Sequence, residues 1–197
     1  GELENAFCAV RPPGHHATRN KAMGFCFFNN VAVAAKYALQ RHNLQRVAVI
    51  DFDVHHGNGT EDILAGDERA LMCSFFQHPF YPYSGDQNPA PNMCNVPVPA
   101  YSKGMDIREV VEMMWIPRLE EFQPEMMFIS AGFDAHREDD MGQLGLTEQD
   151  FSWITQRLKD VARRYCKGRI VSCLEGGYIP SALARSVEAH LRVLADV

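Results

Sequence analysis

Short apolar runs alternate along the chain with longer segments whose apolar residues recur at helical spacing. The runs 6–10, 46–50, 70–76, 126–130 and 169–174 are rich in β-branched and other apolar residues, which is typical of buried strands. The segments 29–42, 105–122, 147–165 and 181–194 carry apolar residues three or four positions apart, which predicts helices with one buried face; a shorter helix is expected at 61–64. This alternation predicts an α/β fold, with a mostly parallel sheet covered by helices on both faces.

Local signals refine two of these segments. Thr147 and Asp150 form a capping-box-like pair at the start of the helix 147–165, whereas Pro117 should end or kink the helix 105–122. The segment 77–99 contains six prolines and little periodicity. We therefore expect it to be a long ordered loop of the kind that carries function.

Polar residues follow the predicted strands at the points where they end. Asp51 and Asp53 follow one apolar run, and Ser74, Asp134 and Tyr178 follow three others. In an open parallel sheet, the carboxyl ends of the strands and the loops beyond them form the ligand crevice. These side chains are therefore expected to converge on one edge of the sheet.

The run 51–60, DFDVHHGNGT, is the strongest chemical signal in the chain. Period-two alternation places Asp51, Asp53 and His55 on one side if the extended conformation continues. A carboxylate and an imidazole at this spacing suit Zn²⁺, and Asp134 could supply a third ligand. Three protein ligands leave one coordination position open for water, which is the arrangement of a catalytic site.

The segment 11–16, RPPGHH, presents two adjacent histidines on a loop. Its prolines stiffen the chain and Gly14 permits an unusual backbone angle, so His15 and His16 can be held at a fixed point. Imidazoles beside a metal site are natural general bases and acids. Asp51 and Asn58 are available as their hydrogen-bond partners, and an anionic partner would hold the imidazole proton more firmly than a neutral one.

Aromatic residues near these loops suggest a substrate channel. In the segment 174–178, LEGGY, two glycines let Tyr178 reach into the crevice, where its hydroxyl could donate to an oxyanion. Phe25 and Tyr81 are expected to wall a narrow apolar channel that grips a long alkyl stem. Phe27 and Phe28 are instead expected to lie in the core.

Composition excludes several classes of protein. The 197 residues are 46% hydrophobic and 22% charged, which predicts one globular domain over 1–197. The net charge of −6 argues against direct nucleic-acid binding but tolerates cationic substrates. The six cysteines are scattered and expected to be reduced, and neither a membrane span nor a secretion signal is seen. The chain is thus expected to be soluble and cytoplasmic.

Five blocks of the chain closely resemble the class II histone deacetylases and the bacterial histone deacetylase-like amidohydrolases. The blocks occur in the family's order, at 11–17, 24–30, 51–60, 130–134 and 174–178. The resemblance implies an arginase/deacetylase-like α/β fold and the zinc-dependent hydrolysis of N-acetyl-lysine to the free amine and acetate.

The resemblance also implies a role for each matching residue. His16 would be the general base, His15 its electrostatic companion, and Tyr178 the donor to the acyl carbonyl. Asp51 and Asn58 would be the partners of the two imidazoles. The zinc ligands would be Asp53, His55 and Asp134. The acyl-lysine tunnel would be lined by Gly24, Phe25, Tyr81 and Met141. A buried structural K⁺ would be held by Asp51, Asp53, His55, Ser74 and Phe75.

Details within the motifs indicate a subclass and a substrate. Asn58 stands where class I enzymes commonly have Asp, and the pair Pro12 and Pro13 resembles class II. Tyr178 is present, whereas class IIa enzymes carry a histidine there, so lysine deacetylase activity is expected. Met141 occupies the position of a glutamate in polyamine-specific relatives, which favours acetyl-lysine over acetylpolyamine.

The chain departs from the family at its front. Members usually have roughly a hundred further residues before the segment that matches Glu4 and Asn5, within the size of a large single domain. The chain is thus expected to be the C-terminal two-thirds of the family domain, with N-terminal strands missing. The partners to consider at that edge are a second copy of the chain, giving a homo-oligomer, and a complementing N-terminal segment.

Two alternatives remain open, namely an acetylpolyamine deacetylase and a catalytically silent module. A catalytically silent module that binds zinc or acyl-lysine would hold ligand without releasing acetate. A two-manganese ureohydrolase is disfavoured, because His56 and Gly57 stand where a second aspartate would be required.

Overall fold

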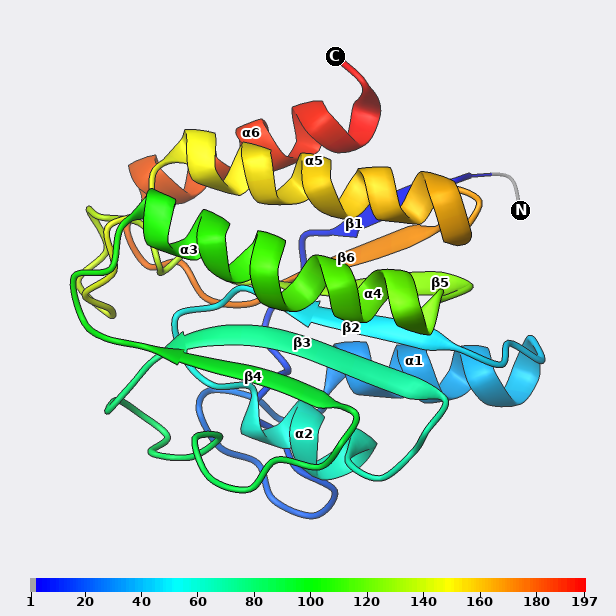
Figure 1. The fold of residues 1–197 in the computed structure, drawn as a ribbon. Helices are drawn as coiled ribbons and strands as arrows, with labels where there is room; N and C mark the ends of the chain where they lie inside the picture. Colours follow the sequence, from blue (N-terminus) through cyan, green and yellow to red (C-terminus); the bar gives the residue numbers. More distant parts are fainter. Residues whose placement is uncertain (1–2) are drawn as a thin grey trace.

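The computed structural model describes residues 3–197 and centres on one six-stranded sheet. All neighbouring strands are parallel and run in the order β1-β6-β5-β2-β3-β4 (Figure 1). The strands are β1 (Asn5–Cys8), β2 (Val47–Asp51), β3 (Ala70–Gln77), β4 (Met93–Val98), β5 (Met126–Ala131) and β6 (Ile170–Leu174). The expected parallel α/β sheet is confirmed.

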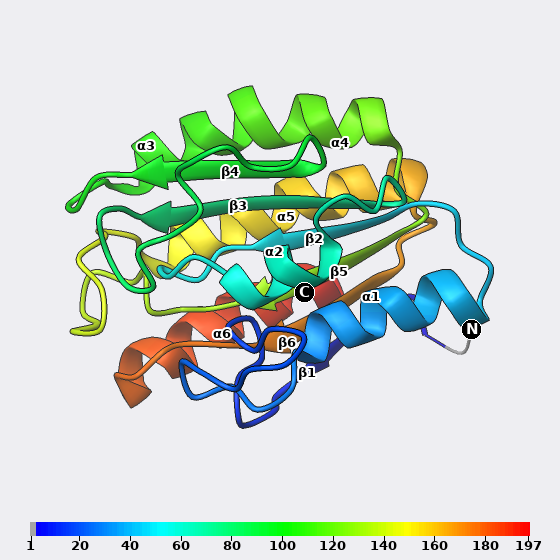
Figure 2. The ribbon, with the colours of Figure 1, turned by 90° about the horizontal axis from the view of Figure 1, so that it is seen from below.

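Helices cover both faces of the sheet, as Figure 2 shows. One face carries α1 (Asn30–Arg41) and α2 (Asn58–Leu64). The other carries α3 (Gly104–Val110), the π-helical segment η1 (Val111–Trp115), α4 (Ile116–Phe122), α5 (Glu148–Tyr165) and α6 (Pro180–Ala195). No helix within residues 3–197 is long and apolar enough to cross a membrane.

Period-two alternation along the central strands divides the apolar side chains between two cores. In β2, Val47 and Val49 pack toward α1, whereas Ala48 and Ile50 pack toward α3, η1, α4 and α5. All five residues of β2 are buried, as expected for a strand covered on both faces. The sheet is therefore packed on both faces and supports the loops at its carboxyl end.

The proline-rich segment 77–99 contains a strand that the sequence analysis assigned to a loop. β4 pairs with β3 from Met93 opposite Met72 to Val98 opposite Gln77. It is the edge strand of the sheet, so the missing N–H of Pro97 need not break a ladder between two neighbours. The expectation of a continuous loop was therefore wrong over Met93–Val98.

Pro117 does not end the helix in which it lies. Helical structure continues from Gly104 to Phe122 through the π-helical turn, where the Ile116 N–H donates to the Val111 carbonyl. Pro117 then falls in the first turn of α4, where an N–H bond to the preceding turn is dispensable. The wider turn thus accommodates a proline that would break a regular α-helix.

Other local expectations are confirmed. The Thr147 N–H and hydroxyl donate to Asp150 Oδ2 at 2.9 and 2.8 Å, closing the capping box of α5. All six cysteines are free thiols, and five of them are buried.

Candidate metal site and active-site pocket

Asp53, His55 and Asp134 meet at the carboxyl end of the sheet. One ligand atom from each lies within 4.8 Å of the others, and all three side chains are buried. His55 Nδ1 is 3.0 Å from Asp53 Oδ1 and 3.2 Å from Asp134 Oδ2. Asp134 follows β5, which is the neighbour of β2, so strand order brings it beside the segment that follows β2.

The segment after β2 is folded rather than extended. β2 ends at Asp51, whose Oδ1 accepts the Asp53 N–H at 3.1 Å, and Asp53 Oδ1 accepts the His55 N–H at 2.9 Å. Two successive carboxylate-to-backbone turns of this kind are typical of Asp beyond a strand. The expected strand-like alternation therefore stops at Asp51, and the turns place His55 beside Asp53 instead.

The donor set fits a divalent cation. An imidazole nitrogen and two carboxylate oxygens suit zinc. Asp134 Oδ1 accepts the Val54 N–H at 3.0 Å, but the buried Oδ2 accepts no hydrogen bond within residues 3–197. Burial lowers the pKa of His55, but the Asp134 and Asp53 carboxylates outweigh it and raise that pKa to about 10. The carboxylates thus create a potential that favours positive charge.

Glycines leave room around these carboxylates. A Cβ on Gly176 would lie 2.1 Å from Asp134 Oδ2, and one on Gly132 would lie 2.2 Å from Asp53 Oδ2. The Gly176 N–H also donates to Asp53 Oδ2 at 2.9 Å. Any side chain at either position would therefore displace an oxygen of the candidate ligands.

The two adjacent histidines have different partners. His15 Nδ1 lies 2.9 Å from Asp51 Oδ2, and His16 Nδ1 lies 2.8 Å from Asn58 Oδ1. Their rings are 4.0 Å apart between centroids. Gly59 and Thr60, in the first turns of α2, donate their N–H groups to the His15 carbonyl, which fixes this loop against α2.

Their environments separate the pKa values of the two imidazoles. Burial lowers the pKa of His15, but the carboxylates of Asp53, Asp51 and Glu175 raise it well above its ordinary value. Burial and the charge of His15 lower the pKa of His16 to about 3. His15 is thus the cationic member of the pair, and His16 is the neutral member able to accept a proton.

Glu175, for which the sequence predicted no role, joins three segments of the site. Its Oε2 accepts the N–H groups of Gly14 and His15 at 2.6 and 3.1 Å, and its Oε1 accepts the Ser130 hydroxyl at 2.9 Å. Burial raises its pKa to about 7. The available signal was a glutamate directly after an apolar strand. A carboxylate that becomes buried there, as Glu175 does, requires hydrogen-bond partners.

A pocket of about 470 Å³ opens above the metal site. It is lined by the four expected channel residues and five others: Gly24, Phe25, Tyr81, Met141, His16, His55, Phe80, Asp140 and Tyr178. Phe80 and Asp140 were not among the predicted lining residues. The ring of Phe80 stacks on that of His55 with centroids 5.4 Å apart. The walls are mainly aromatic, and the imidazoles lie among them.

Gly24 has an unusual backbone angle, and burial changes the pKa of Tyr178. Gly24 has φ +55°, and a Cβ there would lie 2.2 Å from the His16 ring, so this position requires glycine. Burial raises the pKa of Tyr178 above its ordinary range, so its hydroxyl remains a proton donor. The main-chain N–H of Tyr178 donates a hydrogen bond to Asp139 Oδ2 at 2.7 Å.

Phe27 and Phe28 do not lie in the core, contrary to the expectation. They are 70% and 79% exposed. The buried face of α1 begins only at Val31 and Ala32, after the N-cap Asn29, so the two rings precede the part of the chain that packs on the sheet.

The residues expected at a potassium site lie near one another. Asp51 and Ser74 are paired positions on β2 and β3. The Ser74 hydroxyl donates to Asn95 Oδ1 at 3.2 Å. The Phe75 side chain packs in the core on the other face, so only its main chain could serve as a ligand.

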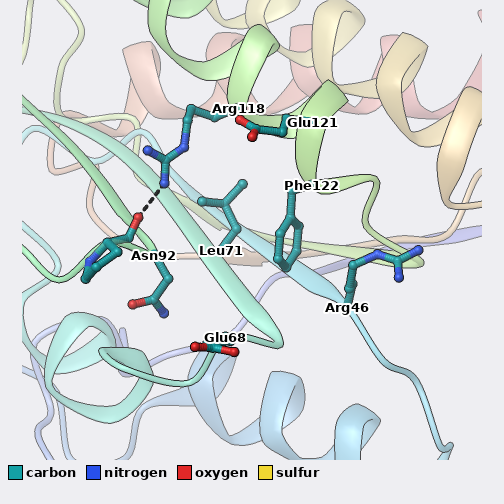
Figure 3. Close-up of a pocket in the computed structure, with 8 residues that line it drawn as sticks. Arg46, Glu68, Leu71, Asn92, Arg118, Glu121 and Phe122 are labelled. Carbon is teal, nitrogen blue, oxygen red and sulfur yellow. Dashed lines mark hydrogen bonds between the residues drawn. The ribbon is translucent and has the colours of Figure 1, made fainter.

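A second cavity of about 520 Å³ lies near the amino ends of the strands (Figure 3). Arg118 donates to the Pro91 carbonyl there at 2.5 Å, and Arg46 Nε donates to the Gln123 carbonyl at 2.9 Å. Both guanidinium groups are therefore already engaged. This cavity shares no lining residue with the pocket above the metal site.

Comparison with known proteins gives consistent results. The family described as "Histone deacetylase domain" matches residues 1–194. "Type-2 histone deacetylase 2" of Dictyostelium discoideum is 42% identical over 97% of this chain, and the "Histone deacetylase-like amidohydrolase" of Pseudomonas aeruginosa is 39% identical over 90%. A crystal structure described as the HDA15 HD domain covers 100% of the chain with a TM-score of 0.93 and 37% identity.

The chain spans only part of each of these proteins. It covers 12% of the Dictyostelium protein, 49% of the Pseudomonas protein and 57% of the crystallised chain. The family match nevertheless extends over nearly the whole of this chain. With this sequence match, this fold and this cluster of buried ligands, the chain belongs to the histone deacetylase family.

Proposed function

We propose that this chain is the catalytic part of a zinc-dependent amidohydrolase that converts N-acetyl-lysine to lysine and acetate. The observation that carries the proposal is the cluster of Asp53, His55 and Asp134 below a pocket lined by His16 and Tyr178. Family membership supports the same reaction class. Asp53, His55 and Asp134 would hold the ion, which would supply Lewis-acid polarisation of the acyl carbonyl and of a water molecule.

His16 is the proposed general base. It lines the pocket, and its low pKa keeps it neutral near pH 7. Its Nδ1 contacts the uncharged Asn58, so no neighbouring carboxylate on that side holds a proton on the ring. His16 would accept the proton of the attacking water and pass it to the leaving amine.

His15 and Tyr178 have supporting roles in this mechanism. His15, paired with Asp51, would supply a fixed positive charge beside His16. The Tyr178 hydroxyl would donate to the oxygen of the tetrahedral intermediate, as oxyanion donors do in other hydrolases. Its ring lies 6.2 Å from that of Phe25, so the two rings face a common channel.

Gly24, Phe25, Tyr81 and Met141 would hold the alkyl stem of the acylated amine. All four line the pocket. Asn58 also supports class II character. Asp51 and Ser74 would hold a structural K⁺, and the site of action would be cytoplasmic. Acetyl-lysine of a peptide or protein is favoured over an acetylpolyamine, because Met141 offers no charge to a second ammonium group.

A pair of variants tests the assignment in the full-length, zinc-loaded protein. Tyr178→Phe is expected to lower turnover of an acetyl-lysine peptide by about two to three orders of magnitude, the loss seen when an oxyanion donor is removed. His16→Ala is expected to remove nearly all turnover but leave the zinc content unchanged. Acetate release and elemental analysis provide the two measurements.

Tyr37→Phe is the matched control, because Tyr37 is an exposed residue of α1 outside the pocket. Turnover in Tyr178→Phe equal to that of this control would contradict the proposal. Loss of zinc from His16→Ala would make His16 a ligand. A wild-type protein that binds zinc and a hydroxamate yet releases no acetate would be a binding module rather than an enzyme.

A further inference from the structure

One carboxylate lines the pocket outside the candidate metal site. Asp140 is the sole acidic residue among the described residues that line the cavity of about 470 Å³; the others are histidine, aromatic, glycine and methionine residues. It is exposed, so it lies at the rim rather than at the floor. The electrostatics of the pocket mouth therefore depend on this side chain.

The charge of Asp140 is not neutralised by the protein. Its carboxylate has no hydrogen-bond or ion-pair partner within residues 3–197, unlike Glu138, which pairs with Arg185 at 2.8 Å. Arg137, the nearest cation along the chain, lines a different cavity. A cation supplied by a ligand would thus meet a free carboxylate.

The main chain on both sides of Asp140 is anchored. The buried carboxylate of Asp139 accepts the Met141 N–H through Oδ1 at 3.0 Å and the Tyr178 N–H through Oδ2 at 2.7 Å. The Asp139 N–H itself donates to the His136 carbonyl at 2.9 Å. The main chain at Asp140 is therefore fixed relative to that of Tyr178.

We propose that Asp140 is a specificity-determining residue that selects acetyl-lysine peptides carrying a basic residue beside the acetyl-lysine. This inference rests on the proposed function and names its substrate class. The basic side chain would pair with Asp140 in the bound substrate and in the transition state alike, so the effect falls on KM rather than on kcat.

The test compares substrates that differ only in charge. Three acetyl-lysine peptides carry Arg, Ala or Glu beside the acetyl-lysine, and an N-acetylated diamine is compared with the acetylated monoamine of equal length. Each is assayed with the full-length, zinc-loaded wild-type protein and with Asp140→Asn, which keeps the shape of the side chain and removes its charge. Glu109→Gln is the control, because Glu109 is an exposed acid of α3 that does not line the pocket.

Asp140→Asn is expected to lower kcat/KM for the Arg peptide by about two- to fivefold, through KM, as exposed ion pairs do. The Ala peptide should be unaffected and the Glu peptide improved. The difference in kcat/KM between Asp140→Asn and the wild type should largely vanish near 1 M salt, where the Debye length is about 3 Å. A loss confined to the Arg peptide would support a flanking basic residue, whereas a loss confined to the diamine would overturn this assignment.

Equal changes for all three peptides, or the same pattern in Glu109→Gln, would overturn the role of Asp140. Hydrolysis without any charge preference would remove this inference and leave the proposed function standing. If no substrate is hydrolysed, the proposed function fails, and binding of the same charge series to the zinc-loaded protein then tests Asp140 separately.

Discussion

At the scale of single residues, Gly176 lies so close to the candidate metal ligands that a side chain at this position would collide with them. Its N–H donates to Asp53 Oδ2, and a Cβ there would lie 2.1 Å from Asp134 Oδ2. Carbon and oxygen atoms do not approach so closely, so either the loop or the carboxylate would have to move. Since zinc bonds are near 2 Å long, such a shift is large on the scale of the site.

Gly176→Ala is therefore expected to weaken zinc binding by at least about tenfold, or about 1.4 kcal/mol. The fold should persist, because Gly176 lies after β6 and outside the cores. Competition for zinc against a chelator of known affinity measures the effect. Gly145→Ala is the control, since a Cβ there would be 3.5 Å from its nearest neighbour, an ordinary contact. Wild-type zinc affinity in Gly176→Ala would contradict the structure of this site.

At the scale of elements, His190 joins α6 to α5 and β6. Its Nδ1 lies 2.7 Å from the Thr155 hydroxyl oxygen, and its Nε2 lies 2.9 Å from that of Ser172. The ring is fully buried and meets Phe7 edge to face, with centroids 5.7 Å apart. Burial lowers the pKa of His190 to about 3 from its ordinary value of 6.5.

The shift of the His190 pKa predicts a pH dependence of stability. Between pH 6.5 and about 3 the unfolded chain binds a proton at His190 and the folded chain does not. The free energy of unfolding should thus decline as the pH falls through this range, by up to about 1.4 kcal/mol per pH unit from this group. Above pH 6.5 this group contributes no slope.

Replacing His190 by glutamine isolates this contribution. His190→Gln keeps polar atoms near Thr155 and Ser172 but cannot take up the proton. Urea unfolding at a series of pH values should give a shallower slope for the variant than for the wild type between pH 6.5 and 3, although carboxylates contribute to both. Identical slopes would show that His190 does not remain neutral in the folded protein.

At the scale of the whole molecule, the candidate metal site links two central strands. Asp53 and His55 follow β2, and Asp134 follows the adjacent β5. The three side chains are brought together only when the sheet forms, so zinc should bind the folded chain in preference to the unfolded chain. Ligands of this kind raise stability in proportion to the logarithm of their concentration.

Zinc is expected to stabilise the protein by about 2.7 kcal/mol at a free concentration one hundred times its dissociation constant. Removal by a chelator should reverse the gain. Asp134→Asn keeps Oδ1 for the Val54 N–H and removes the charge, so it should lose most of the zinc-dependent increment. Denaturant unfolding with and without zinc measures this. An equal increment in the variant would place the ion elsewhere.

Local patterns predicted most of the fold. Strand and helix positions followed from apolar spacing, and the Thr147 capping box was correctly located. Edge strand β4 was missed, because its prolines obscure a ladder that pairs on one side only. The helix does not end at Pro117, because a π-helical turn, which leaves no signal in apolar periodicity, precedes the proline.

The site divides in the same way. By itself the sequence determined the chemical types, that is, paired carboxylates, adjacent imidazoles and a tyrosine after glycines, and their motifs resemble those of one family. Tertiary structure alone decided that Asp134 lies 3.2 Å from His55, that Glu175 ties the histidine loop to β5, and that Asp140 faces the pocket. Periodicity along a chain indicates which face of a helix or strand is buried. Contacts between loops depend instead on the order of the strands in the sheet, and residues far apart in the sequence determine that order.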